Sequence, residues 1–353
     1  MPLPMPPASI RRALRTGGVI PAHPLALTAD RRLDERRQRA LTRYYLDAGA
    51  MGVAIGVHTT QFTIRDPRIR LLEPVLALGA ATISEWTRRP IVRVAGICGE
   101  TGQAVAEARA AADLGYHVGL LSLGGLGRWP DSRLLAHARE VARVVPLMGF
   151  YLQPAVGGRP LGYDFWRRFA EIENLVAIKV APFDRYRTFD VVRAVADAGR
   201  GDVALYTGND DAIVNDLTTT YAIRGPGRRT RRVRFVGGLL GQWAFWTRSA
   251  VRLVTRCRAV HGRRMMPQAL VGLGPAITDL NAAVFDAANQ FRGCIPGIHE
   301  MLRRDGLLAG RWCLDPREEL SAGQRAAIDR VSRAYRRSAD RGFVHANIDR
   351  WLR

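Results

Sequence analysis

Lysine is almost absent from this chain of 353 residues: of its 53 lysine and arginine residues, only Lys179 is lysine. Arginine preserves a surface charge, but its guanidinium stays protonated in proteins. An ammonium that is desolvated among apolar neighbours can instead lose its proton and attack a carbonyl carbon. A need for a neutral amine would therefore explain why lysine is kept at this one position. A coding bias towards arginine, with one lysine left by chance, is the alternative.

The position of Lys179 favours the functional interpretation. The lysine follows the apolar run 175–178 and precedes Val180 and Ala181, a pattern typical of a buried parallel strand with one polar residue near its end. A charge buried there without a partner would be costly. The sequence therefore predicts a nucleophile that forms a Schiff base.

Cysteine is scarce and long apolar runs are missing. The four cysteines lie far apart and show no CxxC spacing, which predicts neither a zinc site nor a disulfide framework and fits a reducing cytoplasm. They are Cys98, Cys257, Cys294 and Cys313. Because no run of about 18 apolar residues occurs, we expect no membrane span. Residues 1–18 are basic and proline-rich without the apolar core of a signal peptide, and we expect a disordered arm there.

Acidic residues are outnumbered, which leaves a net charge of +21. An electropositive field attracts phosphates, anionic substrates and acidic partners. The arginines are spread along the chain, with local clusters only at RRALR and RGPGRRTRRVR, and no signature of a nucleic-acid-binding module accompanies them. We expect an anionic substrate in an arginine-biased sequence, with nucleic-acid recruitment as the alternative.

Eight short apolar runs alternate with stretches of helical periodicity, which predicts parallel strands with crossover helices. The runs are 19–27, 51–57, 91–98, 117–123, 145–153, 175–181, 203–208 and 233–240. Eight such units predict a (β/α)8 TIM barrel over residues 19–260. Residues 261–353 predict a helical extension that packs on the barrel or on a neighbouring subunit. RGPGRRTRR (224–232) predicts a surface loop before the eighth strand.

Catalytic residues of such a barrel lie at the C-terminal ends of its strands. The polar residues at those ends, together with the glycines of the eighth strand, are therefore the candidates. They are Thr59, Thr60, Glu100, Tyr151, Lys179, Asn209, Asp210, Gly237 and Gly238. Hydroxyls, a phenol and an amine at one mouth form a coherent set for carbonyl chemistry.

This pattern resembles the dihydrodipicolinate synthase and N-acetylneuraminate lyase family of class I aldolases, from about residue 19 to about residue 335. The matching pieces occur in the family's order. They are GVIPAHPLALTADRRLD, HTTQF, FYLQP, VAIKVA, TGNDD and GIHEMLRRDGLLAGRWCLDPREELSAGQ. The most specific of these is the tyrosine strand about 28 residues before the lysine strand.

The resemblance implies a role for each matching residue. Lys179 would form an imine with C2 of a 2-keto acid such as pyruvate, and Tyr151 would shuttle the proton. Thr59 would hydrogen-bond that phenol, and Thr60 would hold the substrate carboxylate. We also expect substrate contacts from His58, Glu100, Arg159, Asn209 and Gly237. No metal or organic cofactor is expected, because the imine is itself the electron sink.

Three departures from the family pattern bear on the substrate. The arginine expected after Pro154 is missing, and Arg159 is the nearest substitute. SLGGLGRWP replaces the turn that carries a second tyrosine, and HTTQF lacks the usual Gly-Glu. These losses disfavour the condensation of lysine biosynthesis and favour a related aldolase, lyase or dehydratase. His58 and Glu100 are candidates for the missing acid–base function.

Two other classes of function stay open: a barrel that has lost catalysis and binds a small anionic ligand, and a basic barrel that recruits nucleic acid. We further expect a cytoplasmic homo-oligomer, either a dimer or a tetramer, that acts on a 2-keto acid and an aldehyde.

Overall fold

Eight parallel strands form the centre of the molecule, as the sequence predicts. The computed structural model describes residues 2–225, 230–336 and 339–353. The barrel strands are β1 (Val19–Pro21), β2 (Gly52–Ile55), β3 (Val92–Ile97), β4 (Val118–Ser122), β5 (Leu147–Leu152), β6 (Leu175–Ala181), β7 (Ala204–Thr207) and β10 (Phe235–Leu240). Their order is β1-β10-β7-β6-β5-β4-β3-β2, and a parallel bridge between Ala22 and Ala54 closes the ring. The (β/α)8 barrel is confirmed.

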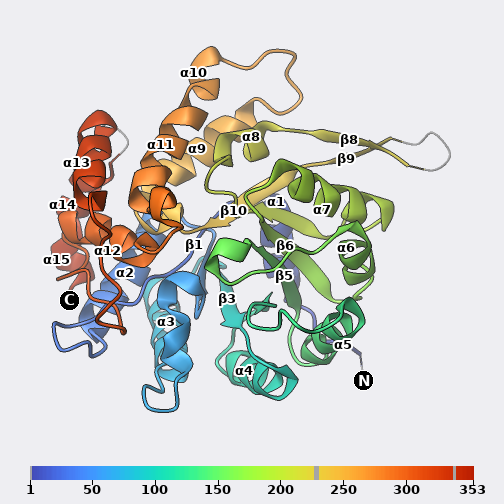
Figure 1. The fold of residues 1–353 in the computed structure, drawn as a ribbon, viewed down its shortest axis with the longest axis horizontal. Coiled ribbons are helices and arrows are strands. Elements are labelled where there is room, and N and C mark those ends of the chain that lie inside the picture. The colour runs from blue at the N-terminus through green and yellow to red at the C-terminus, as the bar shows by residue number, and fades with distance from the viewer. Residues whose placement is uncertain (1, 226–229, 337–338) are drawn as a thin grey trace.

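Helices surround these strands (Figure 1). They are α2 (Glu35–Ala48), α3 (Leu72–Trp86), α4 (Thr101–Asp113), α5 (Asp131–Ala142), α6 (Tyr163–Phe169), α7 (Arg185–Asp197), α8 (Ile213–Thr218) and α9 (Thr247–Ala259). Local signals set their ends: the side chain of Asp34 accepts a hydrogen bond from the Arg37 amide at the start of α2, and Gly49 adopts φ 95° after its end.

Alternate residues of each strand face opposite sides of the barrel wall. In β5, Met148, Phe150 and Leu152 pack in the interior of the barrel, where they share a cluster with Ala177 and Tyr206. Leu147 and Tyr151 pack on the other side, in the layer between strands and helices. This alternation decides which side chains reach the mouth.

The expectation of a disordered N-terminal arm is wrong for residues 8–16. These residues form helix α1 (Ala8–Thr16), and its apolar residues Ile10 and Leu14 are buried against the interior of the barrel. The hydroxyl of Tyr206 donates to the Leu14 carbonyl oxygen at 2.8 Å. Helix α1 therefore closes the barrel at the end opposite the C-terminal ends of the strands.

Two short strands overlap the two ends of segment 224–232, which was expected as a loop before the eighth strand. These are β8 (Tyr221–Arg224) and β9 (Thr230–Val233), which pair antiparallel with Tyr221 opposite Val233. They project beyond the ring of helices (Figure 1). Residues 226–229 of the predicted loop lie outside the described residues.

The C-terminal segment is helical, as predicted. It contains α10 (Gln268–Val271), α11 (Leu273–Val284), α12 (Cys294–Arg304), α13 (Gln324–Ala334), α14 (Arg341–His345) and α15 (Ile348–Trp351). Of these helices, α10 and α11 contact α8, and α15 contacts α2 (Figure 1). Of the helices that the structure describes, none has both the length and the apolar character needed to cross a lipid bilayer.

Candidate active site at the barrel mouth

Lys179 lies near the C-terminal end of β6 and points into the barrel. It pairs with Phe150 of β5 and Tyr206 of β7, and its Nζ lies 4.2 Å from the centre of the Phe150 ring. Only 8% of the lysine is exposed. A Cβ atom at Gly208 would come within 2.8 Å of the lysine Cε, so the glycine leaves room for the lysine side chain.

Burial changes the ionisation of both charged groups at this site. Desolvation lowers the pKa of Lys179 to about 8, and the nearby Asp210 opposes this shift. Desolvation likewise raises the pKa of Asp210 to about 7, against the Gln242 amide and the lysine charge. A lysine with a lowered pKa supplies more neutral amine near pH 7, as a carbonyl-directed nucleophile needs.

A cavity of about 60 Å³ surrounds Lys179. Most of its wall is apolar, and the side chains that can form hydrogen bonds are few. The wall consists of Ala22, Val57, His58, Thr59, Phe150, Leu152, Gln153, Val156, Lys179, Ala181, Phe183, Gly208, Asp210, Gly241, Phe285, Phe291, Cys294 and Ile298. The last four belong to the C-terminal extension, which therefore forms part of the site.

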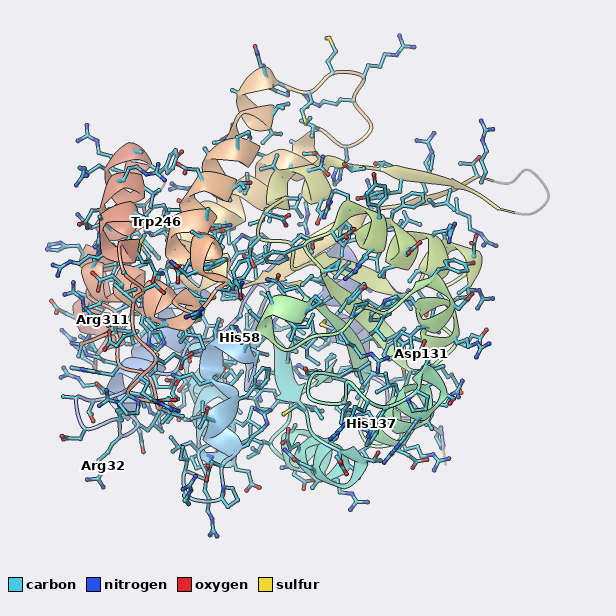
Figure 2. The ribbon with its side chains drawn as sticks, in the orientation of Figure 1. Arg32, His58, Asp131, His137, Trp246 and Arg311 are labelled. Atoms are coloured by element: carbon cyan, nitrogen blue, oxygen red, sulfur yellow. The ribbon has the colours of Figure 1, made fainter. Side chains whose placement is uncertain are left out.

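The turn after β2, η1 (His58–Thr60), supplies His58 and Thr59 to the cavity. Figure 2 shows His58 near the centre of the view, close to the strand ends. Burial lowers the pKa of His58 to about 4, with a further contribution from the Lys179 charge, so the imidazole is neutral at pH 7. The Oγ1 of Thr59 is buried and has no hydrogen-bond partner among the described residues, which leaves it free for a ligand.

Thr60 has a different role from the one expected. Its Oγ1 donates to the His23 carbonyl oxygen at 2.7 Å and accepts from the amides of Gly56 and Val57. The side chain is thus used to hold the turn, and Thr60 does not belong to the cavity wall that the structure describes. These bonds do not support the expected carboxylate contact through its side chain.

The structure does not bring Tyr151 to Lys179. The tyrosine pairs with Val180 on the outer side of the wall, its ring lies 5.2 Å from that of Trp166, and its hydroxyl accepts a hydrogen bond from the Leu161 amide. The residue opposite the lysine is Phe150. The expectation of a tyrosine proton shuttle, and of a Thr59 bond to that phenol, is therefore not met by this geometry.

The side chain of Asn209 also forms its hydrogen bonds within the protein. Its amide nitrogen donates to Thr188 and Asp216, and its side-chain oxygen accepts from the Phe183 amide at 3.0 Å. Phe183, which this bond holds, has φ 52° and lines the cavity. These bonds do not support the expected direct substrate contact, and they give Asn209 a part in positioning a wall residue.

Three further expected contacts lie away from the cavity. Glu100 is exposed at the start of α4. Arg159 donates to the Leu126 and Trp129 carbonyl oxygens and pairs with Asp131 at 3.5 Å.

The third is Gly237, which lies below the mouth, where a Cβ atom would approach the Gly18 oxygen to 2.1 Å. A different glycine, Gly241, reaches the cavity. Substrate contacts from these three residues are not supported.

The sequence reasoning underrated the phenylalanines and Asp210. Phe285 and Phe291 come from a segment without strand signal, so no periodicity indicated that they return to the mouth. Asp210, in the TGNDD turn, was among the candidates at the strand ends, but the substrate contact was assigned to its neighbour Asn209. Among the described residues, no group of three or more histidine, cysteine, aspartate or glutamate side chains could hold a metal ion.

The fold and the buried amine together define a (β/α)8 barrel with one lysine at the C-terminal ends of its strands. Several solved structures share this fold. Dihydrodipicolinate synthase from Acinetobacter baumannii, in complex with pyruvate, superposes with a TM-score of 0.72 at 21% identity, over 90% of this chain and 97% of that one. YagE, an Escherichia coli prophage protein of the dihydrodipicolinic acid synthase family in complex with pyruvate, gives 0.73 at 17% identity, over 90% and 97%.

N-acetylneuraminate lyase from Fusobacterium nucleatum gives a TM-score of 0.70 at 14% identity, over 91% of this chain and 99% of that one. No family model and no curated protein sequence matches the chain. The resemblance noted in the sequence therefore extends to the three-dimensional structure, and at these identities it establishes the fold.

Proposed function

We propose that the protein is a lyase or aldolase that forms an imine between Lys179 and the carbonyl carbon of a small 2-keto acid. The observation that carries this proposal is the lysine itself: the only one in the chain is buried at the barrel mouth with a lowered pKa. Two structures with the same fold are described as pyruvate complexes, which supports a keto acid as the ligand.

The proposed chemistry begins with attack of the neutral Lys179 amine on C2 of the keto acid. The carbonyl oxygen leaves as water, and the protonated imine then stabilises negative charge that develops at C3. Carbon–carbon bond formation or cleavage at C3 becomes feasible without another electron sink. The unpartnered Oγ1 of Thr59 is the hydroxyl best placed to bond the substrate carboxylate.

The cavity wall narrows the substrate class. Four phenylalanines line it, and none of the described residues in the wall is arginine. A polyhydroxylated sugar or a second carboxylate would lose hydrogen bonds to water there and recover few of them. A keto acid and an aldehyde with short apolar substituents fit this wall better. We also propose, as the sequence leads us to expect, that the protein does not catalyse the condensation reaction of lysine biosynthesis.

Borohydride reduction in the presence of pyruvate tests the proposal. We expect mass spectrometry to detect a stable adduct on the Lys179 peptide. A keto acid with an apolar side chain should give a higher yield of adduct than pyruvate. Because the chain has one lysine, the N-terminal amine is the only competing primary amine, and peptide mapping separates the two. Lys179→Arg and Lys179→Met should give no adduct while retaining the wild-type circular dichroism spectrum.

A wild-type protein that gives no adduct with any keto acid would refute imine formation. The outward Tyr151 and the phenyl ring opposite Lys179 favour one alternative for that case, a barrel that binds a small anionic ligand without catalysis. Isothermal titration with the same keto acids would then detect non-covalent binding.

A further inference from the structure

An imine on Lys179 requires a second group that moves a proton at C3. The sequence assigns this task to Tyr151, which faces the helices. Neither strand partner of Lys179 can replace it. Phe150 has no exchangeable side-chain proton, and the hydroxyl of Tyr206 is bonded to the Leu14 carbonyl oxygen at the closed end of the barrel. The proton-transfer group must therefore come from elsewhere on the cavity wall.

Few side chains in that wall are able to exchange a proton. Besides Lys179, the described residues of the wall provide His58, Thr59, Asp210 and Cys294. The hydroxyl of threonine does not ionise in this pH range, and burial raises the pKa of the Cys294 thiol well above its ordinary value. Two candidates are left, His58 and Asp210.

We infer that Asp210 is the group that removes the C3 proton from the imine on Lys179 and later returns it. This inference rests on the proposed function. The family resemblance assigns this proton transfer to the phenol of Tyr151, whereas the inference assigns it to the carboxylate of Asp210.

The position of Asp210 fits this step. Its Oδ1 accepts a hydrogen bond from the Gln242 amide at 3.2 Å, and its main-chain oxygen accepts from the Asn281 side chain at 2.7 Å. These bonds fix the residue between the barrel and the C-terminal extension. Its Oδ2 accepts no hydrogen bond from any group that the structure describes, so one carboxylate oxygen is available to a substrate.

The spacing between the two charged groups is also suitable. No carboxylate oxygen of the described residues lies within 4.0 Å of the lysine Nζ, although Asp210 is close enough to alter the pKa of Lys179. In the imine, C3 lies two bonds from Nζ, about 2.5 Å away. A base about 3 Å from C3, along the C–H bond that points out of the imine plane, then lies more than about 4 Å from Nζ. Direct ion pairing would leave no room for the substrate.

The electrostatic surroundings favour Asp210 over His58 for this role. A proton-transfer group is most effective when its pKa is near the working pH, and burial brings the pKa of Asp210 to about 7. The neutral His58, with its pKa lowered to about 4, is the weaker base. The other titratable groups around the carboxylate are Lys179, Asp211 in the same turn and Cys294 on α12.

The protons and electrons of this step can all be followed within the site. The Asp210 carboxylate takes the C3 proton, the C–H electrons form the C2=C3 bond, and the C2=N electrons return to nitrogen as a neutral enamine. The enamine then takes back this proton at C3, or its C3 attacks the carbonyl carbon of an aldehyde, whose oxygen takes the proton from the Asp210 carboxyl group. Either route restores the imine. Water finally attacks C2 of the imine and releases the lysine amine.

Deuterium exchange separates this step from imine formation. The full-length protein is incubated with pyruvate in D2O, and loss of the methyl proton signal is followed by NMR, in parallel with borohydride trapping. We expect Asp210→Asn to retain the Lys179 adduct while its exchange rate falls by at least about 100-fold, the lower end of acid–base contributions. Asp210→Glu should recover part of the exchange.

Two variants serve as controls. Asp211→Asn removes a neighbouring carboxylate that does not belong to the cavity wall, and it should exchange within about threefold of the wild type. His58→Gln discriminates between the two candidate groups: its exchange rate should fall much less than that of Asp210→Asn, because this variant keeps the carboxylate. Because Asp210 raises the pKa of the lysine, Asp210→Asn should shift the pH midpoint of adduct formation downwards, which a purely structural defect would not do.

Each result is decisive. Unchanged exchange in Asp210→Asn, or a loss in His58→Gln that matches the expected loss in Asp210→Asn, overturns the inference while the proposed function stands. Loss of both adduct and exchange in Asp210→Asn also overturns it, because Asp210 would then act on imine formation. A wild type without any adduct refutes the proposed function, and the inference with it.

Discussion

At the scale of single residues, the rarity of lysine predicted the site better than any motif. Arginine could not serve at position 179, because a guanidinium keeps its proton where an amine is able to lose it. The structure supplies the desolvation that makes this difference matter: apolar side chains surround Nζ and one carboxylate lies nearby. Composition and burial thus point to the same atom.

The lowered pKa of Lys179 predicts a specific pH dependence. The free amine is the reactive form, so the rate of adduct formation with pyruvate should rise about tenfold per pH unit below the pKa and level off above about pH 8. With an unburied lysine, the rate would level off near the ordinary lysine pKa of 10.5 instead. Borohydride reduction that is stopped at set times, repeated at a series of pH values, measures how the rate of adduct formation depends on pH. A midpoint near 10.5 would show that the amine is solvated.

Single residues also show which parts of the site could not be predicted from the sequence. Lys179, His58 and Thr59 were predicted and lie together in one cavity. Thr60 and Asn209 were assigned to the substrate, but their hydrogen bonds hold the protein's own backbone. A polar residue at a strand end has the same sequence signature in both roles. Only the direction of its side chain separates them.

At the scale of elements, the displacement of Tyr151 follows from one irregularity in strand pairing. Leu147 pairs with Leu175, whereas Met148 pairs with Ala177, so β6 contains one extra residue at Val176. Without this bulge, the 28-residue spacing would place Tyr151 opposite Lys179. With the bulge, Phe150 takes that place, because a shift of one residue exchanges the two faces of a strand. The 28-residue spacing identified the two neighbouring strands correctly, but nothing in the sequence indicated the bulge.

The other element boundaries were more predictable. All eight barrel strands lie within or at the edges of the predicted runs, because buried parallel strands are nearly continuous apolar segments. Helix α1 was missed because its arginines and flanking prolines resemble a disordered arm, while only Ile10 and Leu14 bury. The β8–β9 hairpin was missed because its strands are short and polar.

The strand register gives a prediction for Tyr151→Phe. Because the hydroxyl faces α6 and bonds the Leu161 amide, the variant should form the Lys179 adduct and exchange pyruvate protons within about twofold of wild type. It should lose about 1–2 kcal/mol of unfolding free energy, since a buried amide loses its acceptor. Urea denaturation and the NMR exchange assay measure the two effects. A drop in exchange of 100-fold or more would restore the tyrosine shuttle and contradict the observed register.

At the scale of the whole molecule, many arginines serve the architecture. Arg200 donates to the carbonyl oxygens of Ala170, Ile172 and Leu175, and thereby ties α6 to the start of β6. The planar fork of arginine can reach several acceptors at once, which a lysine ammonium does less well. Part of the positive charge is thus explained by internal hydrogen bonding. This reduces the need for a polyanion partner, which a salt titration of nucleic-acid affinity would test.

One buried carboxylate of the C-terminal extension bonds to two helices of the barrel. Asp340, at the start of α14, accepts hydrogen bonds from the Tyr44 hydroxyl at 2.8 Å, the Arg248 amide at 2.6 Å, and both the amide and the hydroxyl of Ser249. Tyr44 belongs to α2, and Arg248 and Ser249 open α9. Asp340 is therefore the point where the extension, the first barrel helix and the last one meet.

Asp340→Ala should weaken the whole fold, because it leaves buried donors without an acceptor. We expect a loss of about 2–4 kcal/mol in the free energy of unfolding, measured by urea denaturation at pH 7. Asp349→Ala, an exposed aspartate of α15, is the matched control and should stay within about 0.5 kcal/mol of wild type. Since the extension also provides Phe285 and Phe291 to the cavity, Asp340→Ala should lower the yield of the Lys179 adduct at denaturant concentrations where the wild type is still folded. Equal stability of the two variants would mean that the extension docks independently of this carboxylate.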